Sequence, residues 1–229
     1  NEVVEDFFFA QKDLEKKKIL ITAGPTYEKI DPVRFIGNYS SGKMGFALAE
    51  ACAERGAEVT LVAGPVSLKT HHPAIKRIDV ESAGEMYQAA MTAFPSSDAA
   101  ILCAAVADYR PENASEQKIK RETEREMTLH LVPNPDIAAS LGAIKREGQV
   151  MVGFALETND EATHAEGKLK RKNLDFIVLN SLRDQGAGFR CDTNKITIID
   201  NAGGVTSYPL KTKREVACDI VNKLVTLLK

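Results

Sequence analysis

The chain has 229 residues, of which 44% are hydrophobic and 27% charged, enough to bury the core of one large α/β domain or two small ones. Its net charge of −2 argues against general nucleic-acid binding, which needs a dominant basic surface. No apolar run approaches the roughly 20 residues that span a membrane, and the four cysteines lack C-x-x-C spacing, so we expect a cytoplasmic protein with free thiols.

The first half of the sequence alternates short apolar strands with helices. Gly56 is expected to end the first helix, and the S-x-x-E capping box that starts at Ser82 opens the second. Strands are expected at residues 18–22, 58–62, 75–80 and 99–105, and helices at 42–55 and 82–94. This order predicts an α/β fold with a Rossmann-like, doubly wound, mostly parallel sheet.

The second half resumes this alternation after a polar interruption. Residues 108–126 are rich in Lys, Arg and Glu without periodicity, which predicts a mobile loop or flap. Asn134 is the expected N-cap of a helix over 135–145. Further strands are expected at 127–132, 149–155 and 175–179, helices at 160–172 and 212–228, and a β-hairpin at 195–208. We therefore expect a linker remnant over residues 1–16 and one domain over 17–229 with a C-terminal β-hairpin extension.

Glycines flank the start of the first predicted helix and indicate an anion-binding site at residues 40–45. Free amides at a helix N-terminus and small side chains let a phosphate approach. The stretch from Gly37 to Lys43 fits G-x-x-x-x-G-K, but Met44 stands where a P-loop has the Ser or Thr that binds magnesium. The dinucleotide pattern G-x-G-x-x-G also fails, because Ser40 replaces its first glycine. The glycines could instead serve only helix packing.

Polar residues just before this helix strengthen the interpretation of an anion site. Arg34 can pair bidentately with a phosphate or carboxylate, and Asn38 can both donate and accept hydrogen bonds. Both follow the first predicted strand, and α/β sheets bind ligands at the carboxyl ends of their strands.

Seven motifs occur in the order seen in bacterial phosphopantothenoylcysteine synthetases, which the chain resembles from about residue 17 to its end. They are ITAGPT at 21–26, DPVR at 31–34, NYSSGKMG at 38–45, AAVADY at 104–109, KIK at 118–120, NPDI at 134–137 and GFALET at 153–158. In many bacteria such a domain is the second half of a bifunctional coenzyme A biosynthesis protein. The first half is a flavin-dependent decarboxylase, so no flavin is expected in this chain.

The resemblance implies a ligase that joins 4′-phosphopantothenate to L-cysteine. The pantothenate carboxylate would attack the α-phosphate of CTP and release pyrophosphate, and the amine of cysteine would then attack the acyl-cytidylate and release CMP. Mg²⁺, cationic side chains and helix-end amides would stabilise the charge. No side-chain nucleophile is needed, in agreement with the lack of a Ser-His-Asp or Cys-His signature. The resemblance also suggests a homodimer, which the 195–208 hairpin could support.

The same resemblance assigns roles to individual residues. Asn38 is expected to be catalytic in the second step, and Lys118 to be a catalytic lid residue that closes over the nucleotide or the intermediate. Asp108 would meet the ribose or a magnesium ion. The substrate pocket would also be lined by Arg34, Ala104 and Ala105. The other expected nucleotide contacts are Gly24, Ser41, Gly42, Gly45, Ala104, Asn134, Pro135, Phe154, Lys168 and Lys172.

Two other functions stay open at this point. A nicotinamide-dependent oxidoreductase on the same fold is disfavoured by the missing G-x-G-x-x-G and the missing acid that would hold a ribose. A non-catalytic nucleotide-binding module would bind CTP and release no pyrophosphate. Ordinary roles are also open: Lys118 could be a solvated charge, Asp108 a turn residue and Phe154 part of the core.

Overall fold

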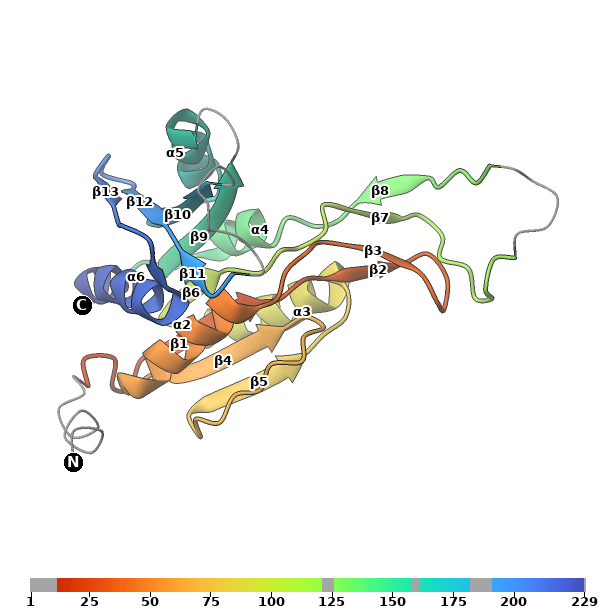
Figure 1. Cartoon of the computed structure of the whole chain (residues 1–229). Helices are drawn as coiled ribbons and strands as arrows, with labels where there is room; N and C mark the ends of the chain where they lie inside the picture. Colours follow the sequence, from red (N-terminus) through yellow and green to blue (C-terminus); the bar gives the residue numbers. More distant parts are fainter. Residues whose placement is uncertain (1–11, 121–125, 158–160, 182–190, 229) are drawn as a thin grey trace.

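One central sheet carries helices on both of its faces in the computed structural model (Figure 1). The structure describes residues 12–120, 126–157, 161–181 and 191–228. The sheet has eight strands in the order β13-β12-β10-β9-β6-β1-β4-β5. Their bounds are β1 (Lys18–Ala23), β4 (Glu58–Ala63), β5 (Ile75–Asp79), β6 (Ala99–Leu102), β9 (Val150–Glu157), β10 (Phe176–Ser181), β12 (Ile196–Asp200) and β13 (Val205–Ser207).

The pairing confirms the predicted doubly wound, mostly parallel sheet. Strands β5, β4, β1, β6, β9 and β10 pair in parallel with one another. The predicted C-terminal hairpin is also confirmed, as β12 and β13. It continues the sheet, because β12 pairs antiparallel with β10.

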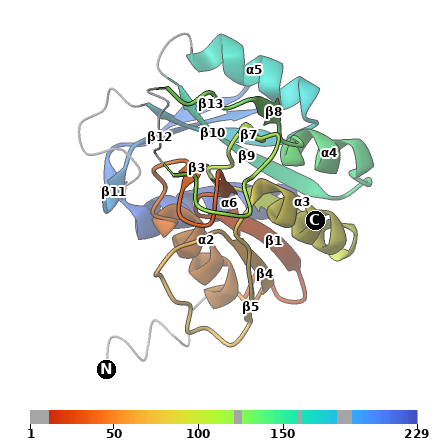
Figure 2. The same ribbon diagram turned by 90° about the vertical axis from the view of Figure 1, so that its right-hand side faces the viewer.

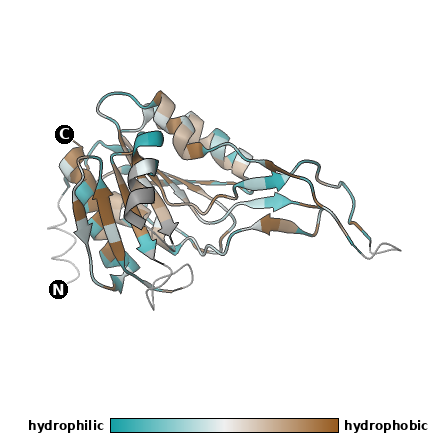
Figure 3. Cartoon of the chain, turned by 90° about the horizontal axis from the view of Figure 1, so that it is seen from above, coloured by the Kyte–Doolittle hydropathy of each residue, from teal (hydrophilic) through white to brown (hydrophobic). Residues whose placement is uncertain are grey.

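Alternating side chains of the strands face two hydrophobic layers. Ile19 and Ile21 of β1 pack with α2 (Lys43–Glu54) and α6 (Lys213–Leu227), whereas Leu20 faces the opposite layer. That second layer contains α3 (Ala83–Ala93), α4 (Ile137–Ile144) and α5 (Glu161–Arg171), and the short 3-10 helix η1 (Phe94–Ser96) follows α3. Figure 2 shows the two helix layers on either side of the sheet, and Figure 3 shows hydrophobic residues concentrated in the strands between them. This period-2 burial explains the short apolar runs of the sequence.

Most predicted helix ends are found where the sequence placed them. Ser82 and Glu85 form the expected capping box of α3, and Gly56 has a φ of +97° just after α2. The predicted cap of α4 is wrong. Asp136, not Asn134, accepts the hydrogen bond from the Ala139 amide at 3.0 Å, because the Asn134 side chain is engaged with the loop that follows β6.

Four short strands form an arm that projects from the carboxyl side of the sheet (Figure 1). The antiparallel pairs are β2 (Tyr27–Lys29) with β3 (Phe35–Gly37) and β7 (Tyr109–Pro111) with β8 (Leu131–Pro133). We call residues 27–37, 109–120 and 126–133 the arm. The sequence predicted a loop over 108–126, and this is wrong for β7; residues 121–125 lie outside the described part of the chain.

The N-terminal boundary, the cysteines and the lengths of the helices can each be compared with the predictions. Leu14 is fully buried and its amide donates to the Arg55 carbonyl at 3.1 Å, while residues 1–11 lie outside the described part, so the boundary at residue 17 stays a prediction. All four cysteines are free, as expected. None of the helices in the described residues is long and apolar enough to cross a membrane.

Gly45 lets α2 approach β1 closely, and its replacement is expected to destabilise the protein. A Cβ atom at Gly45 would lie 2.5 Å from Ala23 Cβ and 3.1 Å from Ala23 Cα. Gly45→Ala should therefore lower the free energy of unfolding by about 1–3 kcal/mol, the usual cost of overpacking, as measured by urea denaturation. Gly167→Ala in α5 is the matched control, because its Cβ would meet no atom within 4 Å. Equal stability of the two variants would contradict the close contact.

Candidate active site

Two neighbouring cavities open beside the carboxyl ends of the central strands. The α4–α5 pocket has a volume of about 270 Å³ and the α2–α6 pocket about 490 Å³. The two pockets share the lining residues Ala104, Val106, Asp108, Phe154 and Lys168. Because they share one wall, they form a two-part cleft that can hold two ligands in contact.

The α2–α6 pocket contains the predicted phosphate cradle. Ser41, Gly42 and Gly45 line it at the start of α2. Gly42 is the N-cap with a φ of 77°, a left-handed conformation that glycine adopts without strain. The free amides of this helix start favour an anion. Gly24 lines neither pocket and packs directly behind Gly42, so its contact with a nucleotide stays a prediction.

Asn38 fixes the loop that follows β6. Its Nδ2 atom donates to the carbonyl oxygens of Ala105 and Val106 at 3.1 and 3.0 Å. The Ala105 amide in turn donates to the Gly24 carbonyl at 2.9 Å. Asn38, Ala104 and Ala105 all line the α2–α6 pocket. The structure thus brings together three of the four residues predicted to bind the acyl substrate.

The α4–α5 pocket gathers the residues predicted to hold the rest of a nucleotide. Its wall includes Asp108, Asn134, Pro135, Phe154, Lys168 and Lys172. The Nδ2 atom of Asn134 donates to the Ala107 carbonyl at 2.8 Å, and the backbone amide of Asn134 donates to the Asp108 carbonyl at 2.8 Å. Asp108 is exposed and lies six residues beyond the end of β6, not at the strand end as the sequence suggested.

Lys172 supplies a cation at the rim of the same pocket. Its Nζ atom lies 2.9 Å from Asp136 Oδ2. Burial alone would raise the pKa of Asp136, but the hydrogen bond from the Ala139 amide and the Lys172 ammonium together hold it below its usual value. The Asp136 carboxylate therefore stays charged near neutral pH and holds Lys172 beside the start of α4.

The side chains offer limited means to bind a metal. No group of three or more His, Cys, Asp or Glu residues that could hold an ion occurs within the described ranges. Asp108 lines both pockets, and Mg²⁺ commonly takes one or two carboxylates together with the phosphates of a substrate. The residues present therefore fit a magnesium ion that arrives with a triphosphate.

Cys103 lines the α2–α6 pocket, but its environment is unsuited to nucleophilic catalysis. Burial raises the pKa of Cys103 to about 12, although the nearby Lys213 ammonium acts in the opposite direction. The group is therefore a thiol at neutral pH, and the thiolate is the reactive form. This agrees with the expectation that the chemistry needs no side-chain nucleophile.

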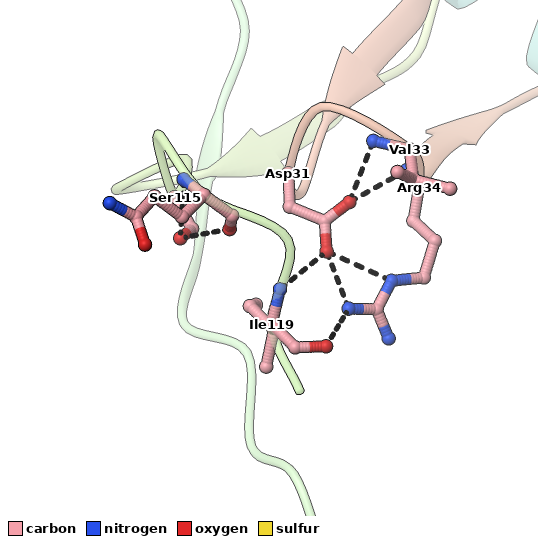
Figure 4. Close-up of polar contacts among 6 residues, drawn as sticks. Asp31, Val33, Arg34, Ser115 and Ile119 are labelled. Atoms are coloured by element: carbon pink, nitrogen blue, oxygen red, sulfur yellow. Dashed lines mark hydrogen bonds and ion pairs between the residues drawn. The ribbon is translucent and has the colours of Figure 1, made fainter. Parts of the chain in front are cut away.

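Arg34 and Lys118 line neither pocket. The Arg34 guanidinium pairs with Asp31, with Nε at 3.0 Å, and donates to the Ile119 carbonyl at 2.8 Å (Figure 4). Lys118 is exposed in the arm next to Ile119. Both residues were predicted to belong to the site, but within this single chain they lie in the arm, away from the two pockets. Their roles stay predictions.

Asp31 is the centre of these arm contacts. Its carboxylate accepts from the Val33 and Arg34 amides, each at 2.8 Å, and from the Ile119 amide at 3.1 Å. We call the contacts among Asp31, Arg34 and Ile119 the arm clasp. The hydrogen bond from Arg34 is the main cause that holds the pKa of Asp31 well below its usual range.

The arm clasp is expected to open when Asp31 loses its charge. Asp31→Asn should speed hydrogen exchange of the Ile119 amide about tenfold or more, because charge-assisted hydrogen bonds are lost. In the wild type the lowered pKa means that the contribution is present above about pH 3.9, the value of a free carboxyl, and is lost as the pH falls through the folded pKa. Protection should therefore be constant from about pH 8 to 5 and decline only in stronger acid.

A surface aspartate serves as the control for this prediction. Asp79 pairs with Arg77 and its side chain is 71% exposed, so Asp79→Asn should leave the exchange of Ile119 unchanged. If Asp31→Asn also leaves it unchanged, the clasp does not hold the arm.

Sequence patterns missed three polar residues of the α2–α6 pocket. They are Asn180, Asn194 and Lys213. Lys43, which lies within the predicted phosphate motif, also lines this pocket and pairs with Asp192 at 2.5 Å. Lys213 is only 7% exposed, and burial is the main cause that lowers its pKa. A signal was available for Lys213, since it follows Thr212, the first residue of a T-x-x-E capping box. Its place beside α2 depends on a tertiary contact that the sequence does not display.

Comparison with known proteins gives concordant matches. Residues 14–228 match the family described as the DNA/pantothenate metabolism flavoprotein C-terminal domain. A curated relative named cysteine/cysteine sulfinic acid decarboxylase, from an unknown prokaryotic organism, is 57% identical over 218 residues, 95% of this chain and 60% of the relative. The coenzyme A biosynthesis bifunctional protein CoaBC of Vibrio parahaemolyticus is 50% identical over 222 residues, 96% of this chain and 55% of the relative.

A solved structure agrees with these matches. The crystal structure of the C-terminal domain of a coenzyme A biosynthesis bifunctional protein CoaBC has a TM-score of 0.81 and 39% identity, and the alignment covers 95% of this chain and 98% of that one. The chain thus spans a little more than half the length of the curated relatives it matches.

Proposed function

Because the chain belongs to the family of DNA/pantothenate metabolism flavoprotein C-terminal domains, we propose that it is a ligase of coenzyme A biosynthesis that joins 4′-phosphopantothenate to L-cysteine. The observation that carries the proposal is the two-part cleft, whose pockets share Asp108, Phe154 and Lys168. A nucleotide in one part and an acyl substrate in the other would meet at that wall. Such juxtaposition of two anions is what carboxylate activation requires.

The pockets suggest how the two substrates would lie. The base and ribose would occupy the α4–α5 pocket beside Phe154, and the phosphates would extend past Lys168 toward the amides at the start of α2. The pantothenate carboxylate would lie near Asn38, beside the loop after β6 that the Asn38 side-chain amide holds in place. Cations and helix-end amides would stabilise the charge that develops on the α-phosphate and on pyrophosphate.

The chemistry proceeds in two balanced steps. A carboxylate oxygen attacks the α-phosphorus, the bond to the β-phosphate oxygen breaks, and pyrophosphate leaves with the electron pair. The neutral amine of cysteine then attacks the acyl carbon. The bond from that carbon to the phosphate oxygen breaks, the nucleoside monophosphate leaves with its electron pair, and the proton from nitrogen passes to solvent.

The nucleotide and the metal are finer parts of the same proposal. We propose CTP as the nucleotide, on the resemblance of the seven motifs to the bacterial ligases, and Mg²⁺ carried by its phosphates beside Asp108. Relatives named bifunctional extend well beyond this domain, and we propose that a flavin-dependent decarboxylase domain precedes it in a cytoplasmic full-length protein.

We also propose that the protein is a homodimer formed through the arm. The arm and its adjoining loop expose large apolar side chains, with Val33 61%, Phe35 50%, Tyr39 78% and Tyr109 55% exposed. Apolar surface gathered on one projecting element is typical of an interaction site. The arm of one subunit would carry Lys118 to the cleft of the other, which gives this residue the lid role that its own chain does not. The 195–208 hairpin is the weaker candidate, because only its three-residue strand β13 lies at the edge of the sheet.

The test is a product assay with both nucleotides. Purified protein with Mg²⁺, cysteine and phosphopantothenate should form phosphopantothenoylcysteine with CTP and release one pyrophosphate per product. Absence of product with both CTP and ATP would sink the ligase proposal. Binding of CTP without pyrophosphate release would favour a nucleotide-binding module, and reduction of a nicotinamide cofactor would favour an oxidoreductase.

A further inference from the structure

A polar side chain interrupts an apolar row of β10 where this strand reaches the α2–α6 pocket. Phe176 and Val178 are fully buried in the layer formed with α2 and α6, and Asn180 is next in the same row. Within the described residues, the Oδ1 atom of Asn180 is buried and has no hydrogen-bond partner. A buried acceptor without a donor costs about 1–3 kcal/mol, so an amide here indicates a ligand that supplies the donor.

The neighbouring segment repeats this interruption. Ile198 and Ile196 of β12 belong to the same layer, and Asn194 precedes them in the row on β11 (Thr193–Asn194). Asn194 is 2% exposed, and its Nδ2 atom lies 3.9 Å from the Met44 sulfur, a weak acceptor. Asn180 pairs with Ile196 across the sheet, so the two amides lie at the same end of adjacent rows.

Lys213 brings a positive charge to this end of the pocket. Strand β11 pairs with β14 (Lys211–Thr212), and this pairing places the start of α6 beside Asn194, in the pocket that Asn180 also lines. The Lys213 ammonium donates to the carbonyls of Cys191 and Thr193 and lines the cavity. These carbonyls hold the ammonium in place at the wall of the cavity.

From these contacts we infer that the pocket end formed by Asn180, Asn194 and Lys213 is the subsite for the α-amino acid that is the second substrate. The amine donates to Asn180 Oδ1, and the α-carboxylate pairs with Lys213 and accepts from Asn194. The inference rests on the proposed ligase function and assigns its amino-acid site. The same cavity contains Asn38, so an amine bound here lies beside the acyl group it attacks.

The orphan oxygen distinguishes an amino acid from a phosphate. A phosphate dianion offers acceptors only, so it would leave Asn180 Oδ1 unsatisfied. An amino acid carries an anion and a donor on one carbon, which matches a cation and an acceptor at one pocket end. The Lys213 charge also disfavours the protonated amine, and the neutral amine is the nucleophile.

The experiment compares two amine substrates, cysteine and cysteamine, to separate the contact with the carboxylate from the contact with the amine. Cysteamine has the amine and thiol of cysteine but lacks the carboxylate. In the full chain, Lys213→Met should lower kcat/KM for cysteine about 50-fold, as expected for a buried ion pair, and change that for cysteamine less than about threefold. Asn180→Leu, which keeps the branched shape of the side chain and removes the acceptor, should lower both values. Neither variant should change pyrophosphate release measured without any amine.

Matched variants and readouts make each outcome decisive. Lys211, which pairs with Asp219 outside the pocket, gives the control Lys211→Met, expected to behave as wild type. Equal losses for cysteine and cysteamine in Lys213→Met would show a merely structural lysine and overturn the inference. Slower pyrophosphate release in either variant would assign the group to the phosphates and also overturn it. If the wild type releases no pyrophosphate with CTP or ATP, it is the proposed function that fails.

Discussion

Asn38→Asp is expected to lower the rate of product formation about 100-fold or more, while pyrophosphate is still released. The Asn38 amide donates to two carbonyl oxygens at 3.0 and 3.1 Å. A carboxylate in its place would oppose both oxygens, so the loop at Ala105 would move away from the acyl group. Loss of one positioned donor in an active site costs about 10²–10³ in rate. A single-turnover experiment should show pyrophosphate in proportion to enzyme and an accumulated acyl nucleotidylate.

The control for this prediction is the same chemical change elsewhere. Asn201 is exposed in the turn between β12 and β13, and Asn201→Asp should leave both steps unchanged. If Asn38→Asp slows both steps equally, Asn38 has no special part in the second one.

Lys168→Met is expected to weaken use of the nucleotide, with kcat/KM for CTP reduced about 100-fold. Lys168 lines both pockets, so its charge lies where the phosphates would pass from one to the other. A neutral side chain of similar length keeps the packing of α5 and removes that charge. Steady-state kinetics with varied CTP at fixed phosphopantothenate and cysteine measure the effect.

A neighbouring lysine on the same helix provides the comparison. Lys170 is exposed and lines neither of the two pockets. Lys170→Met should therefore retain wild-type kinetics. If both variants lose activity to the same degree, the effect is one of general surface charge, and Lys168 is not a phosphate ligand.

The sequence predicts the central sheet because its buried strands appear as short apolar stretches that can be recognised from neighbouring residues alone. Strands such as β1 and β6 are short apolar runs between clear turn signals, and the capping box at Ser82 marks a helix start in four residues. The sequence also predicts much of the cleft. Ala104 follows β6 and Phe154 belongs to β9, two neighbouring parallel strands whose carboxyl ends meet at one edge.

The arm and the inner pocket end depend on contacts between distant residues. Strand β7 has three residues and pairs with β8 at least 20 residues later, so no local pattern marks it. Arg34 carries the charge expected of a substrate ligand, but only the fold shows that Asp31 and Ile119 engage it. Asn180 looks like an ordinary strand residue until the orphan state of its oxygen is seen.

Helices α2 and α6 lie against each other, and both begin at the same pocket, one at Lys43 and the other at Lys213. The positive ends of two helix dipoles therefore point at one place, beside Lys43, in a chain whose net charge is −2. Anionic substrates of the proposed ligase are therefore expected to be attracted to this cleft. The association rate constant for such substrates should fall as ionic strength rises, since salt screens this steering over distances of about 10 Å.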